Sequence, residues 1–326
     1  GVQTQAAVAT LDSQSGQWSS TDSVSDPSMA TSGVSMTTTT DGTVHLAYQQ
    51  DKIYMRSRAS GATTWGDPQV ITPSSTAFNP EIAGMPDGSL SAAWWDGAVM
   101  RFADRAAGSD TWSTPHDIAV TQHHPGTAQL TPDPDGDGLA AMWAEYDVNG
   151  TPSDGSDDIS YMTFARRSGG VWTAAHQVDA GSVTGWTVFG TGHELVAGWI
   201  FLGGGITTTT ATMDAAGNAF GAESAIGSGV VSAVPNVARR PDGSIFGGYY
   251  SGPYPPDTVS TLRRQADGSW ASSHQYDDQT LSLNDGGGIV ADALGNLIIT
   301  WETSDHTAMA AVGDGAPPTI SGVDVP

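Results

Sequence analysis

Two sequence markers each occur six times along this chain of 326 residues, and this repetition constrains the fold more than any other feature. The first marker is an aliphatic residue followed four positions later by an aromatic residue, which places both side chains on one face of a β-strand. The second marker is an aromatic residue that closes a glycine-containing hairpin. The copies of the first are Val44/Tyr48, Leu90/Trp94, Leu139/Trp143, Leu195/Trp199, Ile245/Tyr249 and Leu297/Trp301, and those of the second are Trp18, Trp65, Trp112, Trp172, Phe220 and Trp270.

Successive copies of each marker lie about fifty residues apart. The hairpin aromatics are separated by 47, 47, 60, 48 and 50 residues, and the strand aromatics by 46, 49, 56, 50 and 52 residues. A period of this length holds about four short strands, which is one blade of a β-propeller. The sequence therefore predicts an all-β fold, a six-bladed β-propeller built from four-stranded antiparallel blades.

The order of the markers predicts how the propeller closes. Trp301 has no later hairpin aromatic and Trp18 has no earlier strand aromatic, so we expect N- and C-terminal strands to close the last blade and remove two free sheet edges. Residues 5–11 and 307–312 both resemble the third strand of that blade, and their pairing stays open. We expect the propeller to span residues 1–315, with residues 316–326 ("APPTISGVDVP") as a linker or the start of an immunoglobulin-like module.

The hairpins carry a family resemblance. The stretch from Arg58 to Trp65, "RASGATTW", resembles the aspartate-box repeat of sialidase-like propellers, and the likeness recurs in all six blades. The resemblance implies that the tryptophans are structural, although the aspartate of the box is missing from the hairpins at Trp18, Trp65 and Trp172. Sialidase activity would further imply an arginine triad at the channel mouth, but the arginines here fall on third strands or turns. We interpret the arginine before each hairpin tryptophan as a structural brace.

Composition excludes several classes of partner. The chain has 35 acidic and 11 basic residues, a net charge of −24, and no apolar run that approaches the length of a membrane helix. Such a surface repels phosphate backbones and anionic lipid, so we expect neither nucleic-acid binding nor membrane insertion. The absence of cysteine rules out disulfides and thiolate sites. We expect a secreted or cell-surface protein with other modules on the same chain.

We expect the binding face to be the one where the loops between blades meet the loops between second and third strands, called here the loop face. The longest insertion there runs from Ala144 to Asp158. Aromatic rings can stack on sugars while acidic and amide groups bind hydroxyls. The candidate ligand-binding residues on this face are Trp95, Asp96, His123, His124, Tyr146, Tyr254, Asp285 and Asp305.

Three functions fit this pattern. The leading hypothesis is a non-catalytic module that binds a glycan or another surface molecule. The alternative is a polysaccharide-active hydrolase or lyase, because paired carboxylates can act as acid and base. Its candidate catalytic residues are Glu145, Asp147, Glu302 and His306. The third possibility is a scaffold without a ligand. The chain has no Gly-x-Ser-x-Gly, phosphate-loop or His-Glu-x-x-His motif.

The stretch "PDPDGDG" at 132–138 is the one candidate metal site. Asp133, Asp135 and Asp137 have the spacing of a calcium-binding loop, and the hairpin resembles those that bind calcium in integrin-type propellers. Leu139 and Ala140 stand where such loops carry a further acidic ligand. The same register is occupied by simple turns in other blades, so a turn without metal is the alternative. No other cofactor is expected.

Overall fold

In the computed structural model every regular element of the described residues is a β-strand. None of them therefore forms a helix of the length and apolarity that a membrane span requires. The structure describes residues 4–12, 17–97, 99–120, 124–125, 128–132, 138–147, 159–180, 183–191, 194–201, 207–212, 224–228, 236–240, 242–251, 258–265, 267, 269–277, 288–291, 296–302, 307–313 and 319–324.

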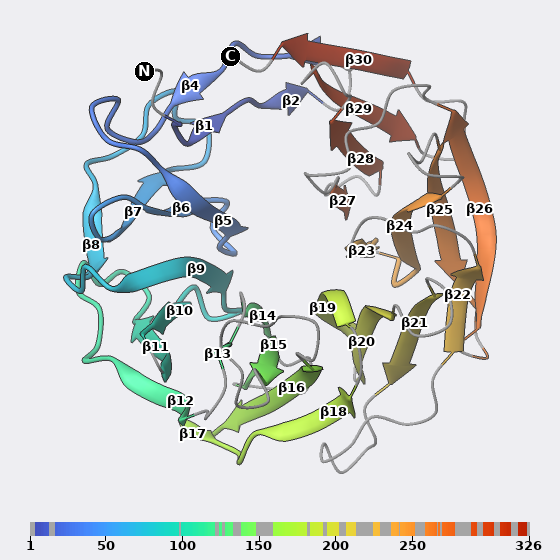
Figure 1. Cartoon of the computed structure of the whole chain (residues 1–326). Coiled ribbons are helices and arrows are strands. Elements are labelled where there is room, and N and C mark those ends of the chain that lie inside the picture. Colours follow the sequence, from blue (N-terminus) through green and yellow to red (C-terminus); the bar gives the residue numbers. More distant parts are fainter. Residues whose placement is uncertain are drawn as a thin grey trace. The chain divides into compact units, whose positions relative to one another are not determined.

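The chain forms two compact units, each built from antiparallel sheets (Figure 1). Unit 1 holds Gly1–Val8 and Asp22–Ala180, and unit 2 holds Ala9–Thr21 and Gly181–Pro326. Each unit contains three of the repeated sheets that the sequence predicts, together with a two-stranded pair from near the N-terminus.

Three repeated sheets form unit 1. The first sheet is β5 (Ser32–Thr38), β6 (Val44–Gln49), β7 (Ile53–Arg58) and β8 (Gln69–Thr72). The second is β9 (Ala77–Gly84), β10 (Leu90–Asp96), β11 (Val99–Arg105) and β12 (His116–Val120). The third is β13 (His124–Pro125), β14 (Gln129–Pro132), β15 (Leu139–Asp147), β16 (Ile159–Ser168), β17 (Val171–Trp172) and β18 (His176–Ala180). A short pair, β1 (Ala7–Val8) with β4 (Asp22–Ser23), completes the unit.

Both sequence markers have the structural roles that the pattern predicts in unit 1. The strand aromatics Tyr48, Trp94 and Trp143 are 2%, 1% and 0% exposed. Alternate residues of a strand face opposite sides, so Trp94 joins the core shared with β7, whereas Ala93 joins the core shared with β15. The hairpin tryptophans Trp65, Trp112 and Trp172 pack against these cores.

The predicted arginine brace is present in two blades. The guanidinium of Arg58 lies 5.1 Å from the ring centre of Trp65, and that of Arg105 lies 5.9 Å from Trp112. A guanidinium over an indole is an attractive arrangement that fixes the hairpin against its strand. The structural interpretation of these arginines is therefore confirmed.

The turns between first and second strands also match the sequence. Asp41 accepts a hydrogen bond from the backbone N–H of Thr43 (3.0 Å), and Asp87 accepts one from Ser89 (2.8 Å). The glycine after each of these aspartates has a positive φ, 80° and 84°, and a residue with a side chain would be strained in this conformation. The corresponding turn with Asp133, Asp135 and Asp137 lies outside the described residues.

The first strands of the unit 1 sheets are linked by side chains rather than by backbone pairing. Ser35 and Thr37 of β5 accept hydrogen bonds from the backbone N–H groups of Ile82 (3.0 Å) and Gly84 (2.9 Å) in β9. These bonds satisfy edge N–H groups of β9 that no strand covers.

The other three repeated sheets form unit 2. The first is β19 (Val183–Thr191), β20 (Glu194–Phe201), β21 (Thr207–Thr212) and β22 (Ser224–Ser228). The second is β23 (Asn236–Arg239), β24 (Ile245–Ser251), β25 (Thr258–Arg264) and β26 (Trp270–Asp277). The third is β27 (Gly288–Ala291), β28 (Leu297–Glu302), β29 (Thr307–Gly313) and β30 (Thr319–Asp324).

The last sheet settles which segments pair in it. Its third strand is β29, one of the two alternatives left open, whereas Ala7–Val8 pair with β4 instead. Its fourth strand is β30, which pairs with β29 in the register from Val312↔Thr319 to Thr307↔Asp324. The sheet therefore extends beyond residue 315 into the segment expected to be a linker. The N-terminal strands β2 (Leu11–Asp12) and β3 (Gln17–Trp18) form a hairpin, and β3 lies next to β30 of the last sheet.

Candidate functional site

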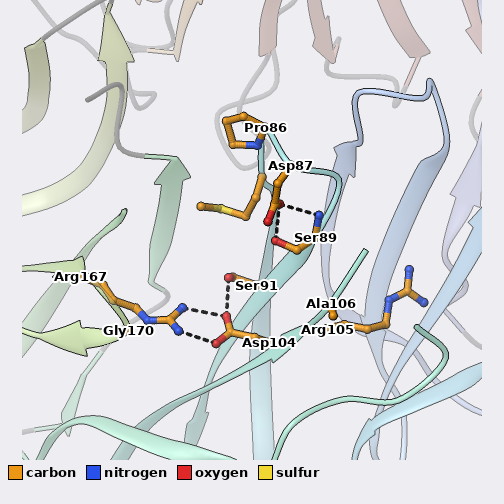
Figure 2. Close-up of a pocket in the computed structure, with 10 residues that line it drawn as sticks. Pro86, Asp87, Ser89, Ser91, Asp104, Arg105, Ala106, Arg167 and Gly170 are labelled. Carbon is orange, nitrogen blue, oxygen red and sulfur yellow. Dashed lines mark hydrogen bonds and ion pairs between the residues drawn. The ribbon is translucent and has the colours of Figure 1, made fainter. Parts of the chain in front are cut away.

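A pocket of about 540 Å³ opens in unit 1 at the turn end of the second and third sheets, and we call it the turn-end pocket. Figure 2 shows its walls, which come from the β9–β10 turn, from β10 and β11, and from the β16–β17 turn. The lining residues are Met85, Pro86, Asp87, Ser89, Ser91, Asp104, Arg105, Ala106, Arg167 and Gly170.

An ion pair between two sheets forms one wall of the pocket. Arg167 on β16 donates from Nη1 and Nη2 to the two carboxylate oxygens of Asp104 on β11, at 2.8 and 2.7 Å (Figure 2). Ser91 on β10, directly across from Asp104, donates to the same carboxylate at 2.6 Å. The guanidinium also lies 5.0 Å from the ring centre of Phe102. This fork geometry and the ring beneath it fix the orientation of Arg167.

The ion pair keeps hydrogen-bonding capacity for a ligand. A carboxylate has about four acceptor positions and a guanidinium has about five N–H donors. Asp104 uses three of its positions on Ser91 and Arg167, and Arg167 uses two of its donors on Asp104. One acceptor position of Asp104 and the second N–H groups on Nη1 and Nη2 of Arg167 therefore remain unused, whereas Nε of Arg167 is buried. A hydroxyl group that donates and accepts at once matches this arrangement.

The opposite wall supplies a second acceptor. Oδ1 of Asp87 accepts hydrogen bonds from the backbone N–H and the hydroxyl of Ser89, at 2.8 and 2.6 Å. These bonds hold the pKa of Asp87 below its usual value, so the carboxylate stays ionised. Its Oδ2 accepts no bond among those that the structure describes. Met85 and Pro86 add apolar surface beside it.

Arg105 contributes to the pocket wall without presenting its charge there. Its side chain points away from Asp104 in Figure 2 and donates to Oε1 of Gln69 on β8 at 3.0 Å. Burial lowers the pKa of Arg105 from its usual value, although the group remains a cation. The charged groups that face the pocket are thus two carboxylates and one guanidinium.

Two predicted ligand-binding residues on the loop face have structural roles. Trp95 is 4% exposed and packs edge-on against Phe78 with ring centres 5.7 Å apart, so its ring offers no open face for a ligand. Asp96 accepts hydrogen bonds from Arg101 (2.9 Å), Ser74 (2.9 Å) and Thr76 (2.5 Å). Trp95 is thus a core residue and Asp96 anchors the β8–β9 loop, and ligand binding by these two residues stays a prediction.

The structure brings some other predicted residues together in the third sheet. His124 lies directly across from Tyr146, and Pro125 across from Glu145, in the pairing of β13 with β15. Glu145 accepts a hydrogen bond from the indole N–H of Trp143 at 2.9 Å. Asp147 ends β15 opposite Ile159, and Glu302 ends β28 in unit 2.

The remaining predicted residues lie outside the described part of the chain. These are His123, Tyr254, Asp285, Asp305, His306 and the three aspartates of the candidate calcium loop. Among the described residues, no group of three or more His, Asp and Glu side chains is arranged to hold a metal ion.

Sequence reasoning missed the residues of the turn-end pocket because it assigned the arginines before the hairpins to a purely structural role. The available signal was that the residue across from the Ser91 position of each second strand differs between blades, and that it is an aspartate, Asp104, in the second blade. Only the contact between two sheets, Asp104 with Arg167 across 63 positions of sequence, reveals that these residues meet.

A second missed residue is Glu81 on β9. Its carboxylate lies between β5 and β14, where it interacts with Ser35 and with the backbone of Leu130. Burial raises the pKa of Glu81 from 4.5 to about 7, and both hydrogen bonds oppose that shift. The signal in the sequence was a single carboxylate within the otherwise uncharged strand "AFNPEIAG".

Comparisons with known proteins identify the fold. No known family model matches the sequence, and no curated protein matches it. Among solved structures, a fungal lectin from Aleuria aurantia, described as a six-bladed β-propeller with a novel fucose recognition mode, has a TM-score of 0.58 at 12% identity, over 91% of this chain and 97% of its own. A protein of unknown function from Dyadobacter fermentans has a TM-score of 0.60 at 13% identity, over 90% and 94%.

A third neighbour is the SapL1 lectin in complex with α-methyl fucoside, with a TM-score of 0.52 at 10% identity over 90% of this chain and 96% of its own. Identities this low establish fold and not family. The repeated four-stranded sheets and these neighbours together show that the chain has the all-β, six-bladed β-propeller fold.

Proposed function

We propose that this chain is a non-catalytic glycan-binding module and that the turn-end pocket holds the sugar. The observation that carries the proposal is the Ser91–Asp104–Arg167 cluster, which offers unused acceptors and donors side by side in a pocket large enough for a saccharide. The fold supports it, because one structural neighbour is described as a six-bladed propeller lectin with a fucose recognition mode and another as a lectin in complex with α-methyl fucoside.

The chemistry of the pocket suits a hydroxyl-rich ligand. Asp87 and Asp104 can accept from sugar hydroxyls while Arg167 donates to them, and charge-assisted bonds of this kind are stronger than neutral ones. Met85 and Pro86 can contact the apolar C–H surface of a sugar ring. A saccharide uses both types of surface at once.

A glycan array tests this function. The wild-type chain should bind a subset of glycans, and Ala106→Trp should abolish that binding by filling the pocket from an exposed position. Ala59 is the equivalent exposed residue of the first sheet, since Arg58 and Arg105 occupy the same register. Ala59→Trp is therefore the matched control and should bind like the wild type. Equal binding by both variants would place the sugar elsewhere.

The loop face remains a second candidate surface for the same function. The pairing of His124 with Tyr146 places two of its predicted residues next to each other. Substituting both with alanine should leave array binding intact if the turn-end pocket is the site. Loss of binding in that variant alone would move the site to the loop face.

The hydrolase or lyase alternative is tested with the same ligands. We expect bound glycans to be recovered unchanged after long incubation, and Glu145→Gln and Glu302→Gln to bind like the wild type. Release of shorter products that stops in either variant would establish catalysis in place of simple binding.

The setting and the cofactor complete the proposal. A net charge of −24 and the sialidase-like hairpins suit a secreted or surface protein whose chain carries further modules. Calcium at Asp133, Asp135 and Asp137 is proposed as an option for structural support only. Calorimetric titration of calcium against the wild type and Asp135→Ala tests it, and the absence of heat in both proteins would reject the site.

A further inference from the structure

We propose that, among the six register positions that the structure describes, one forms a saccharide site of the turn-end type and that the equivalent position of the first sheet is closed by His45. This inference rests on the proposed glycan-binding function and deepens it, because it specifies the number of sites and the class of sugar. It depends on comparing one register position across all six repeated sheets.

On each second strand, one residue lies three positions before the strand aromatic, and it pairs with a residue of the third strand. These two residues form the pair that differs between sheets. In the second sheet this pair is Ser91 and Asp104, the hydroxyl and carboxylate that form the pocket wall. The pairs in the other sheets, in chain order, are His45/Ser57, Ala140/Arg166, Val196/Thr212, Phe246/Arg263 and Ile298/Val312. Of these six described pairs, Ser91/Asp104 alone contains a carboxylate.

The first sheet is the informative comparison because it has the same neighbouring cation. Arg105 stands in the register of Arg167. Burial lowers the pKa of His45, and the nearby charge of Arg105 lowers it further. His45 is 4% exposed, and its two ring nitrogens are hydrogen-bonded to Ser57 (2.7 Å) and Thr39 (3.1 Å). The imidazole thus occupies the space between the turn and the third strand.

The partner residues show that the two positions differ chemically. Thr39 takes the register of Met85, and its hydroxyl is bonded to Asp41 at 2.7 Å as well as to the imidazole. The polar groups of this position therefore satisfy one another. In the turn-end pocket, by contrast, Asp104 and Asp87 retain unused acceptor positions facing open space.

The charge of the pocket specifies the ligand class. Asp104 is neutralised by Arg167, whereas Asp87 is ionised and lies on the other wall. The pocket has a net negative charge within a chain whose own net charge is −24. Like charges in close proximity are repelled, so the site should take a neutral sugar residue and reject sialylated or sulfated ones.

The experiment counts sugars bound at saturation. Equilibrium dialysis uses labelled methyl glycosides of fucose, galactose and mannose, each tested alone, with methyl sialoside as the anionic comparison. We expect one neutral glycoside per wild-type chain and none of the sialoside. The double substitution His45→Ser with Ser57→Asp places a hydroxyl and a carboxylate opposite Arg105, and it should raise the number bound to two.

A reciprocal variant tests the same inference if the His45→Ser, Ser57→Asp variant does not fold. Ser91→His with Asp104→Ser transplants the arrangement of the first sheet into the pocket, so it should bind no glycoside while retaining the thermal transition of a folded chain. Two or more sugars bound by the wild type, or one bound by the double variant with a normal transition, would overturn the inference. Absence of binding by the wild type to every glycan of the array would instead reject the proposed function itself.

Discussion

At the scale of single residues, the environment of a carboxylate decides its role in this protein. The side chain of Asp96 is 10% exposed and is held by donors from β11 and the β8–β9 loop. Asp104 is 30% exposed, in an ion pair at the wall of a pocket, and Glu81 is enclosed between neighbouring first strands. The sequence did not separate Asp96 from Asp104, whereas Glu81 stood out as the single carboxylate of an otherwise uncharged strand. Only their partners, which come from other sheets for Asp104 and Glu81, distinguish their environments.

Glu81 gives a pH dependence that can be measured. The folded state holds the proton of Glu81 more tightly than the unfolded state does. The stability that protonated Glu81 contributes to folding is therefore fully present below pH 4.5 and is lost as the pH rises through about 7. A difference of one pKa unit is worth about 1.4 kcal/mol. The glutamine of Glu81→Gln cannot ionise. The free energy of unfolding of this variant, relative to that of the wild type, should therefore increase as the pH rises through this window.

Denaturant unfolding of both proteins across that pH range provides the measurement. Asp67→Asn, at an exposed carboxylate, is the control and should follow the wild-type profile. His45 contributes with the opposite sign in part of the range, because burial lowers its pKa to about 4. The difference between wild type and Glu81→Gln cancels that contribution. A difference that does not change with pH would contradict the assignment of Glu81.

At the scale of elements, the repeat itself was the most predictable part of the structure. Buried Tyr48, Trp94 and Trp143 show why: in each of the three unit 1 blades a large aromatic at a fixed strand position fills the core between sheets. The polar residues buried at the turn ends of the second strands could not be predicted in the same way. Ser91 and His45 share a register, yet one lines a pocket and the other closes the space, and this depends on the neighbouring strand and turn.

The hairpin tryptophans test the structural interpretation of the second marker. Trp112 packs against the core of the first two sheets and lies under Arg105. Trp112→Ala should lower the free energy of unfolding by about 2 to 4 kcal/mol, because a partly buried large ring is removed and a cavity remains. Val171→Thr, at a residue 71% exposed, is the control and should change stability by less than about 0.5 kcal/mol. Equal stability of the two variants would contradict a packing role for the hairpin.

At the scale of the whole molecule, the repeat count predicted the fold, and the chain ends were harder to place. Both 5–11 and 307–312 had the composition of a third strand, and "PPTISGVDV" read as a segment that follows a domain. The period of the sequence predicts how many strands there are. It does not predict which of two similar segments pairs with the edge of a given sheet. In the structure, β29 and β30 occupy the last two positions of the final sheet.

This arrangement makes truncation informative. Removal of residues 316–326 deletes β30 and exposes the edge of β29 along six paired positions. An uncovered edge strand invites association with other chains. We expect the shortened chain to unfold at lower temperature and to aggregate during size-exclusion chromatography. A truncated protein that stays monomeric with an unchanged thermal transition would show that residues 316–326 are dispensable, as a linker would be.

A crystal structure of the chain with the neutral ligand that binds best on the array would show whether the turn-end pocket of this propeller binds a sugar. We expect a sugar between β10–β11 and the β16–β17 turn, with ring hydroxyls within hydrogen-bond distance of Asp104, Arg167 and Asp87. A sugar bound on the loop face with the turn-end pocket empty would contradict it.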